Sequence, residues 1–111
     1  MRQFHNYVLD YKWEVSGEYT SAHMETAWAS EAMFFIRVEE ARGTNFRFDA
    51  RAQISVNGVD WIDEGTAFDP ITRNGQYVIR LKHFGGWLRI TGGITGENAG
   101  ATVTTNLVLK E

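Results

Sequence analysis

One chemical candidate in this 111-residue sequence is an acidic group beside a tryptophan, in which Asp60, Asp63 and Glu64 flank Trp61. Two carboxylates can serve as general acid and base in glycoside hydrolysis, and several can bind calcium. The spacing lacks the ordered oxygen ligands and the turn glycine of an EF-hand loop. We therefore interpret the group as a solvated loop that follows a hairpin.

The other residue types that carry chemistry lack the spacing that their chemistry needs. His5, His23 and His83 form no His-x-His or His-x-x-x-His pair. Ser55 lacks the flanking glycines of a nucleophile elbow, and the glycine-rich segment 92–96 is not followed by the Lys-Ser/Thr of a phosphate loop. The absence of cysteine excludes disulfides, thiolate metal sites and cysteine nucleophiles. We expect no catalytic residue, no metal and no cofactor.

Composition and charge describe one globular domain, 1–111, without nucleic-acid or membrane partners. The chain is 43% hydrophobic and 14% aromatic with a single proline, which is too apolar for a disordered chain. Its net charge is −3, and the arginines of the segment 37–51 alternate with acidic residues, so no basic patch for nucleic acid is expected. No apolar run approaches a membrane span, and no signal peptide is recognisable at the N-terminus.

Hydrophobic residues recur with a period of two, which is typical of half-buried β-strands. The alternation covers the segments 7–15, 34–38, 46–56, 77–81 and 101–109. Seven to nine short strands at even spacing predict an all-β, antiparallel β-sandwich of a jelly-roll-like kind.

Turn signals separate these segments. Asn57-Gly58 favours a tight type I′ hairpin, because that turn needs positive φ at both central residues. The segment 21–30 is ambiguous, and a strand or extended loop is favoured over a helix. Further turns are predicted at 41–45, Asp69-Pro70, Asn74-Gly75, Gly85-Gly86 and 92–100.

Aromatic side chains are numerous and have two alternative roles. Trp13 lies in the apolar row of the segment 7–15, and Trp87 begins a predicted strand directly after Gly85-Gly86. Both are expected in the core. Trp28, Trp61 and Tyr19 are candidates for an interface or ligand surface, because exposed aromatics can stack on sugar rings or anchor a protein partner.

The last predicted strand, 101–109, is a candidate sheet edge. It contains no charged residue, and its outward row of Thr102, Thr104 and Asn106 could hydrogen-bond a neighbouring chain. This interpretation predicts a symmetric or particle-bound oligomer. The alternative is that the strand lies in the centre of its sheet.

The sequence also resembles two groups of known proteins. The segments 55–61 and 75–80 resemble a hairpin pattern of discoidin and galactose-binding-like jelly-roll modules, although the flanking cysteines of discoidin modules are absent. A broader set of segments is similar to small stand-alone β-sandwich proteins of phage and prophage structural gene clusters. This set comprises 25–28, 34–38, Asn57-Gly58, 84–89 and 106–111.

The second resemblance implies a non-enzymatic structural or assembly protein of a phage virion, such as a head decoration, head–tail or tail accessory protein. Its expected partners are copies of itself and a capsid or tail protein. Its expected location is the virion, assembled in the host cytoplasm, and a cytoplasmic protein is the alternative. A carbohydrate-binding module with a glycan ligand is the alternative, and a small hydrolase is a third hypothesis.

Overall fold

A computed structural model describes residues 4–82 and 84–111 and contains seven β-strands in antiparallel pairing. Within this part of the chain there is no helix long and apolar enough to cross a membrane. The strands are β1 Phe4–Val15, β2 Glu18–Thr20, β3 Met24–Glu25, β4 Glu31–Ser55, β5 Ile62–Ala67, β6 Gly75–Lys82 and β7 Trp87–Lys110. The predicted all-β antiparallel class is confirmed, and the ambiguous segment 21–30 contains only the short strand β3 between extended loops.

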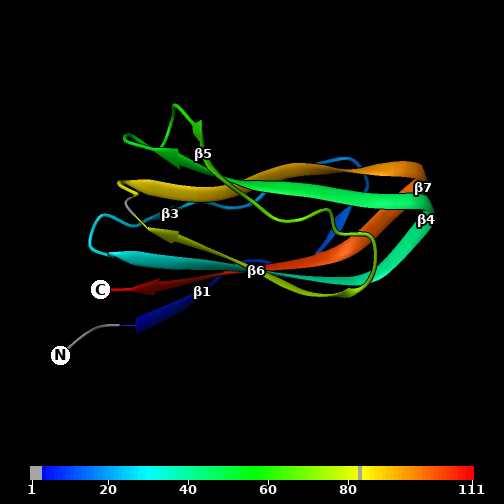
Figure 1. Cartoon of the computed structure of the whole chain (residues 1–111), viewed down its shortest axis with the longest axis horizontal. Coiled ribbons are helices and arrows are strands. Elements are labelled where there is room, and N and C mark those ends of the chain that lie inside the picture. Colours follow the sequence, from blue (N-terminus) through cyan, green and yellow to red (C-terminus); the bar gives the residue numbers. More distant parts are fainter. Residues whose placement is uncertain (1–3, 83) are drawn as a thin grey trace.

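Two of the strands are far longer than the sequence pattern indicates. β4 has 25 residues and β7 has 24, and they pair with each other along nearly their whole length. Figure 1 shows that both strands fold over together at the end of the molecule farthest from the two termini. Each of them therefore contributes one half to each of two layers, which pack face to face as a β-sandwich.

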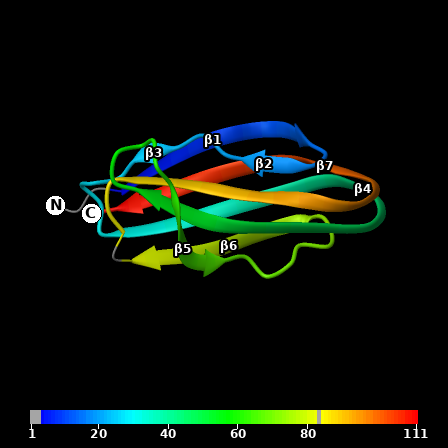
Figure 2. The same cartoon turned by 90° about the horizontal axis from the view of Figure 1, so that it is seen from above.

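The first layer has the strand order β1–β7–β4–β6, and it uses the segments 102–110 of β7 and 31–39 of β4. The second layer uses the segments 87–95 of β7 and 47–55 of β4, with β2 and β3 beside β7 and β5 beside β4. Figure 2 shows β1 and β6 at opposite sides of the molecule, consistent with their places at the two ends of the first layer. The last strand segment thus lies between β1 and β4, so its prediction as a sheet edge was wrong and the central alternative is confirmed.

The fold-over replaces two predicted turns. The segment 41–45 and the glycine-rich segment 92–100 both remain inside continuous strands, with three register shifts between Glu39 and Arg47. Positive φ angles at Glu40 and Asn45 allow β4 to fold over from one layer to the other while it stays paired with β7. Gly92 allows the two strands to approach closely, because a Cβ there would overlap the backbone carbonyl of Asp49.

The core lies between the inner faces of the two layers. The predicted alternation is confirmed for β4, where Phe34, Ile36 and Val38 of the first layer are fully buried, as is Phe48 of the second. The inner row of the last segment is buried as predicted. Its members are Ala101, Val103, Thr105, Leu107 and Leu109.

The predicted alternation was wrong at four positions, one of which is Tyr11, 68% exposed on β1. Trp13 is 59% exposed, because register shifts between Val8 and Trp13 and a positive φ at Lys12 interrupt the alternation of β1. Trp87 is only half-buried, because Leu88 and not Trp87 faces the core at the start of β7. Val56 is exposed because it lies beyond the end of β4.

A hairpin at Asn57-Gly58 is confirmed, but its turn is wider than a two-residue type I′ turn. Asn57 does not have a positive φ, and the chain runs through residues 56–61 before β5 begins. The Asn57 side-chain oxygen accepts hydrogen bonds from the backbone N–H groups of Val59 and Asp60, at 2.9 Å each. The loop is therefore organised by an asparagine side chain and not by paired positive φ angles.

Tyr19, a predicted surface residue, is 3% exposed and connects the two layers. Its hydroxyl, on β2 of the second layer, donates to the Asp10 carboxylate at 2.6 Å and lies 2.6 Å from the Thr105 hydroxyl of the first layer. Burial, and then the hydrogen bond to Asp10, raise the pKa of Tyr19 far above its usual range. The hydroxyl therefore stays protonated and keeps donating.

The Tyr19→Phe substitution should lower the free energy of unfolding by about 1–3 kcal/mol, because it leaves the buried Thr105 hydroxyl and the Asp10 carboxylate without this partner. Urea denaturation measures the loss. Tyr77→Phe is a matched control, since its hydroxyl donates to the Arg73 carbonyl at an exposed position, and it should change stability by less than about 0.5 kcal/mol. Equal effects of the two substitutions would contradict the structural role of Tyr19.

Candidate functional site

The three predicted acidic residues near Trp61 do not converge. Asp63 accepts hydrogen bonds from Gln53 and Arg51, which lower its pKa in that order of importance. Asp60 instead accepts from Asn57 at 3.0 Å, and Glu64 accepts from the backbone of Thr66 at 2.9 Å. Each carboxylate has its own local partner, and the three form no shared catalytic or calcium site. Asp60 lies in the loop, as interpreted, whereas Asp63 and Glu64 lie on β5 and not in a loop.

Trp61 lies in an aromatic cluster of the second layer. The Arg89 guanidinium lies 4.2 Å from the centre of its ring, and the His23 ring lies 5.6 Å from it. His23 also contacts Trp87, with ring centres 5.4 Å apart. The Arg89 guanidinium thus lies over one face of Trp61, where a sugar ring would otherwise stack.

The other predicted aromatic residues lie elsewhere. Trp28 is half-buried, packs against the core and meets the His5 ring edge-to-face at 5.3 Å. Because Tyr19 is buried, it contributes no surface. The structure therefore does not assemble Trp28, Trp61 and Tyr19 into one flat aromatic surface. His83 lies outside the described residues, and among those described no group of His, Asp or Glu side chains is placed to hold a metal ion.

The predicted polar row of the last strand segment lies on the solvent side of the first layer, which we call the outer face. Thr104 and Asn106 are half-buried there, whereas Thr102 is buried and its hydroxyl donates to Glu14 at 2.6 Å. The Thr104 hydroxyl accepts from the backbone of Lys12, and the Asn106 amide donates to the Asn6 side chain. The row therefore bonds to β1 of its own chain.

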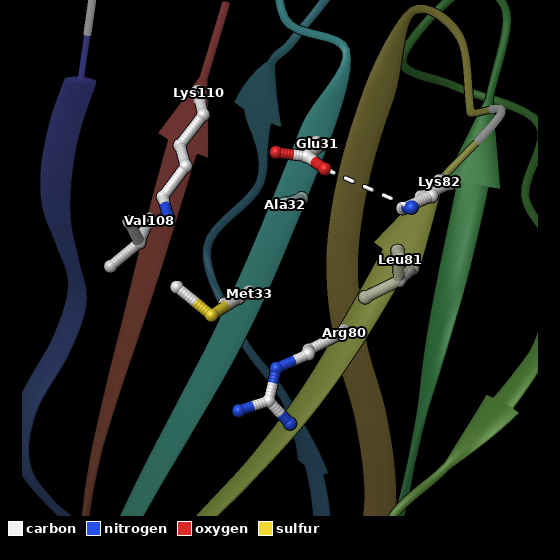
Figure 3. Close-up of a pocket in the computed structure, with 8 residues that line it drawn as sticks. All are labelled: Glu31, Ala32, Met33, Arg80, Leu81, Lys82, Val108 and Lys110. Carbon is white, nitrogen blue, oxygen red and sulfur yellow. Dashed lines mark ion pairs between the residues drawn. The ribbon is translucent and has the colours of Figure 1, made fainter.

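The outer face is hollowed at two adjoining places. The first cavity, of about 430 Å³, lies between the ends of β4, β6 and β7 (Figure 3). Met33 lies near its centre, and Lys82 and Glu31 form an ion pair of 3.9 Å across it. Arg80 and Lys110 add two further cations to the lining. The first cavity thus combines a small apolar floor with a predominantly basic rim.

The second cavity, of about 510 Å³, crosses all four strands of the first layer. It adjoins the first cavity, because Val108 lines both. Its lining is more polar and includes Arg37, with Thr104 and Gln76 as its cross-strand neighbours. The full lining comprises Asn6, Tyr11, Lys12, Phe35, Arg37, Glu39, Gln76, Thr104, Asn106 and Val108.

The lining of the two cavities combines charged, polar and aromatic side chains. Among the described residues, the lining side chains offer cations, amides, hydroxyls and aromatic rings, but no histidine, serine or cysteine. The two lining carboxylates, Glu31 and Glu39, are eight residues apart on one strand, which corresponds to about 26 Å at the usual strand rise. Glycoside hydrolysis needs its two carboxylates within about 10 Å of each other. Basic residues predominate in the lining, although the whole protein has a net charge of −3.

Sequence reasoning found only part of this surface. It identified Thr104 and Asn106 as outward-facing, but it missed Met33, Phe35 and Arg80 on the neighbouring strands. The available signal was the outward phase of the segments 31–39 and 76–82, where basic and apolar residues alternate with the core residues. The pairing of β6 with β4 was needed to place these residues side by side.

No family model and no curated protein sequence matches the chain. Solved structures do match it in fold. The SPBc2 prophage-derived protein YomS has a TM-score of 0.66 and 5% identity, over 100% of this chain and 96% of that one. A chain of infectious bursal disease virus, Gx strain, has a TM-score of 0.62 and 9% identity, over 100% of this chain and 32% of that one.

A third similar structure is dimeric latent PorU from Porphyromonas gingivalis, with a TM-score of 0.53 and 10% identity, over 99% of this chain but only 13% of that one. Because the identities are this low, the similarities establish the β-sandwich fold alone. The YomS match differs from the other two in covering nearly the whole of both chains. The similarity to discoidin-type modules stays a prediction.

Proposed function

We propose that this protein is a non-enzymatic structural or assembly component of a phage-type virion. The observation that carries the proposal is the end-to-end match in fold with a prophage-derived protein. A second match, with a chain of a virus structure, points in the same direction. In this proposal the partners are copies of the protein itself and a capsid or tail protein, and the place of action is a head decoration, head–tail or tail accessory position.

The outer face supplies the contact surface in this proposal. Its basic rim at Arg80, Lys82 and Lys110 would complement an acidic surface on the partner protein. The apolar floor at Met33 and the half-buried Phe35 would be covered in the contact. Such a basic and apolar combination suits protein recognition, because charge directs the approach and apolar burial holds the complex.

Particles purified from cells that encode this chain should contain it in a fixed ratio to the major particle protein, as measured by quantitative mass spectrometry. Arg80→Glu should lower this ratio at least tenfold, since it reverses a charge of the basic rim. Arg47→Glu is the matched control, because Arg47 is an exposed arginine that pairs with Asp49 in the second layer. Absence of the wild-type chain from the particles would contradict the proposal.

The second candidate function is carbohydrate binding, and the lining of the second cavity favours it. Asn6 and Asn106 offer amide groups there, and Tyr11, which is 68% exposed, offers an aromatic face. Amides and aromatic rings are the groups that bind sugar hydroxyls and sugar rings. Saturable binding of an oligosaccharide by the isolated protein, without any particle, would favour this function over the first.

A further inference from the structure

The first layer has two open edges, and they differ in chemistry. β1 pairs only with β7, and β6 pairs only with β4, among the residues that the structure describes. An open edge has unpaired backbone N–H and C=O groups, which can pair with another chain unless charges, bulges or proline prevent it. The β6 edge carries the exposed cations Arg80 and Lys82, so two copies of this edge would repel each other.

The β1 edge is protected along only half of its length. Its second half contains Asp10, Lys12 and Glu14, with register shifts and a positive φ at Lys12. Its first half, Phe4–Leu9, contains no Asp, Glu, Lys, Arg or Pro. The pairing of Phe4–Val8 with β7 is also regular, without any register shift. This half is therefore a straight, uncharged edge on which a further strand can add.

Four of the eight large exposed apolar residues among those described lie on the same strand. Phe4 is 61% exposed and Val8 is 55% exposed, and both point to the outer face. If two copies of β1 pair antiparallel with Asn6 opposite Asn6, Phe4 of each copy lies opposite Val8 of the other. His5 of each copy then lies opposite Tyr7 of the other copy, on the inner side of the sheet. Aromatic and β-branched side chains are a favourable cross-strand pair, so the segment is complementary to itself.

We infer that a second copy of this chain docks on the Phe4–Val8 edge of β1, in an antiparallel pairing about a two-fold axis through Asn6. The first layers of the two copies then form one continuous sheet, and their outer faces form one continuous surface. This inference deepens the proposed function, on which its role in a particle rests, by naming the surface through which copies join. An isologous contact of this kind closes on itself and gives a dimer.

The oligomeric state of the purified protein tests the inference without any particle. Sedimentation velocity at micromolar concentration should give about twice the monomer mass of 12.6 kDa. Val8→Lys should raise the dimer dissociation constant at least tenfold, because it places a charge on each copy of the edge. Val59→Lys, at a loop residue that is 76% exposed, should leave the dimer intact.

A disulfide locates the axis, and the cysteine-free chain gives this experiment no background. Asn6→Cys should cross-link two copies under mild oxidation, because directly opposed residues of paired strands lie within disulfide range. Gln76→Cys, on the other open edge, should not cross-link.

A monomeric wild type, a dimer unaffected by Val8→Lys, or cross-linking only through Gln76→Cys would each overturn the inference. A monomeric wild type that still enters particles would refute this surface alone, whereas an intact dimer absent from particles would refute the proposed function alone.

Discussion

The Phe34→Ala variant should lose about 3–5 kcal/mol of unfolding free energy, which is the usual cost of emptying a buried phenylalanine site. Phe34 is fully buried in the first layer, on a segment of β4 that has strands on both sides. The β6 and β7 strands on its two sides are held by backbone hydrogen bonds and cannot move far. Most of the cavity left by the substitution should therefore persist. Chemical denaturation, or the melting temperature where unfolding is reversible, measures the loss.

Phe35→Ala is the matched control for this experiment, because it removes the same side chain from the next position on the strand. Phe35 is only half-buried and lies on the outer face, beside the second cavity. Its replacement should destabilise the domain much less than Phe34→Ala while altering the recognition surface. Equal losses from the two substitutions would mean that the core does not lie on the Phe34 side of β4.

The second large effect is expected for Leu88→Ala, with a loss of about 2–5 kcal/mol. Leu88 is fully buried near the start of β7. The neighbouring Trp87→Ala removes more atoms, but from a half-buried ring that packs on His23 and over Gly58. We expect the smaller loss from Trp87→Ala in the same denaturation experiment. A larger loss from Trp87→Ala than from Leu88→Ala would instead support the sequence-based prediction that Trp87 lies in the core.

The contrast between Trp87 and Leu88 shows why alternation alone could not place every core residue. Where one strand runs straight, as at Phe34–Val38, a period of two identifies the inner face correctly. At Trp87, two aromatic or aliphatic residues are adjacent and either phase is consistent with the sequence. The tertiary pairing of Leu88 with Ile54 and Met24 on its two sides decides the phase.

The sharing of β4 and β7 between the two layers was the second feature that local sequence patterns could not predict. Glycine and asparagine near residues 43–45 and 92–98 have the composition of turns, and sequence reasoning assigned them as turns. In the structure the two segments lie opposite each other and bend together. A bend of this kind depends on the partner strand about 50 residues away, and no short-range rule contains that information.

The candidate site was predictable only in part for the same reason. Alternation showed that Thr104 and Asn106 face outward, and the structure agrees. Their neighbours Arg37 and Phe35 come from a segment about 70 residues earlier in the chain, through the pairs Arg37–Thr104 and Phe35–Asn106. The surface is built from four strands, so its prediction requires the order of the strands in the sheet. Composition and residue spacing do not provide that order.

The central place of the segment 101–110 in the first layer also determines when that layer can form. This segment pairs with β1 and with β4, both of which the ribosome makes well before it. Until it is synthesised, β1 has no partner, and the fully apolar inner row of Phe34, Ile36 and Val38 has only part of its cover. The pair Phe4–Lys110 closes a loop of nearly the whole chain, which is entropically slow. We expect this layer to form only after the segment 101–110 is synthesised and to fold in milliseconds to seconds, with the nascent chain prone to aggregate until then.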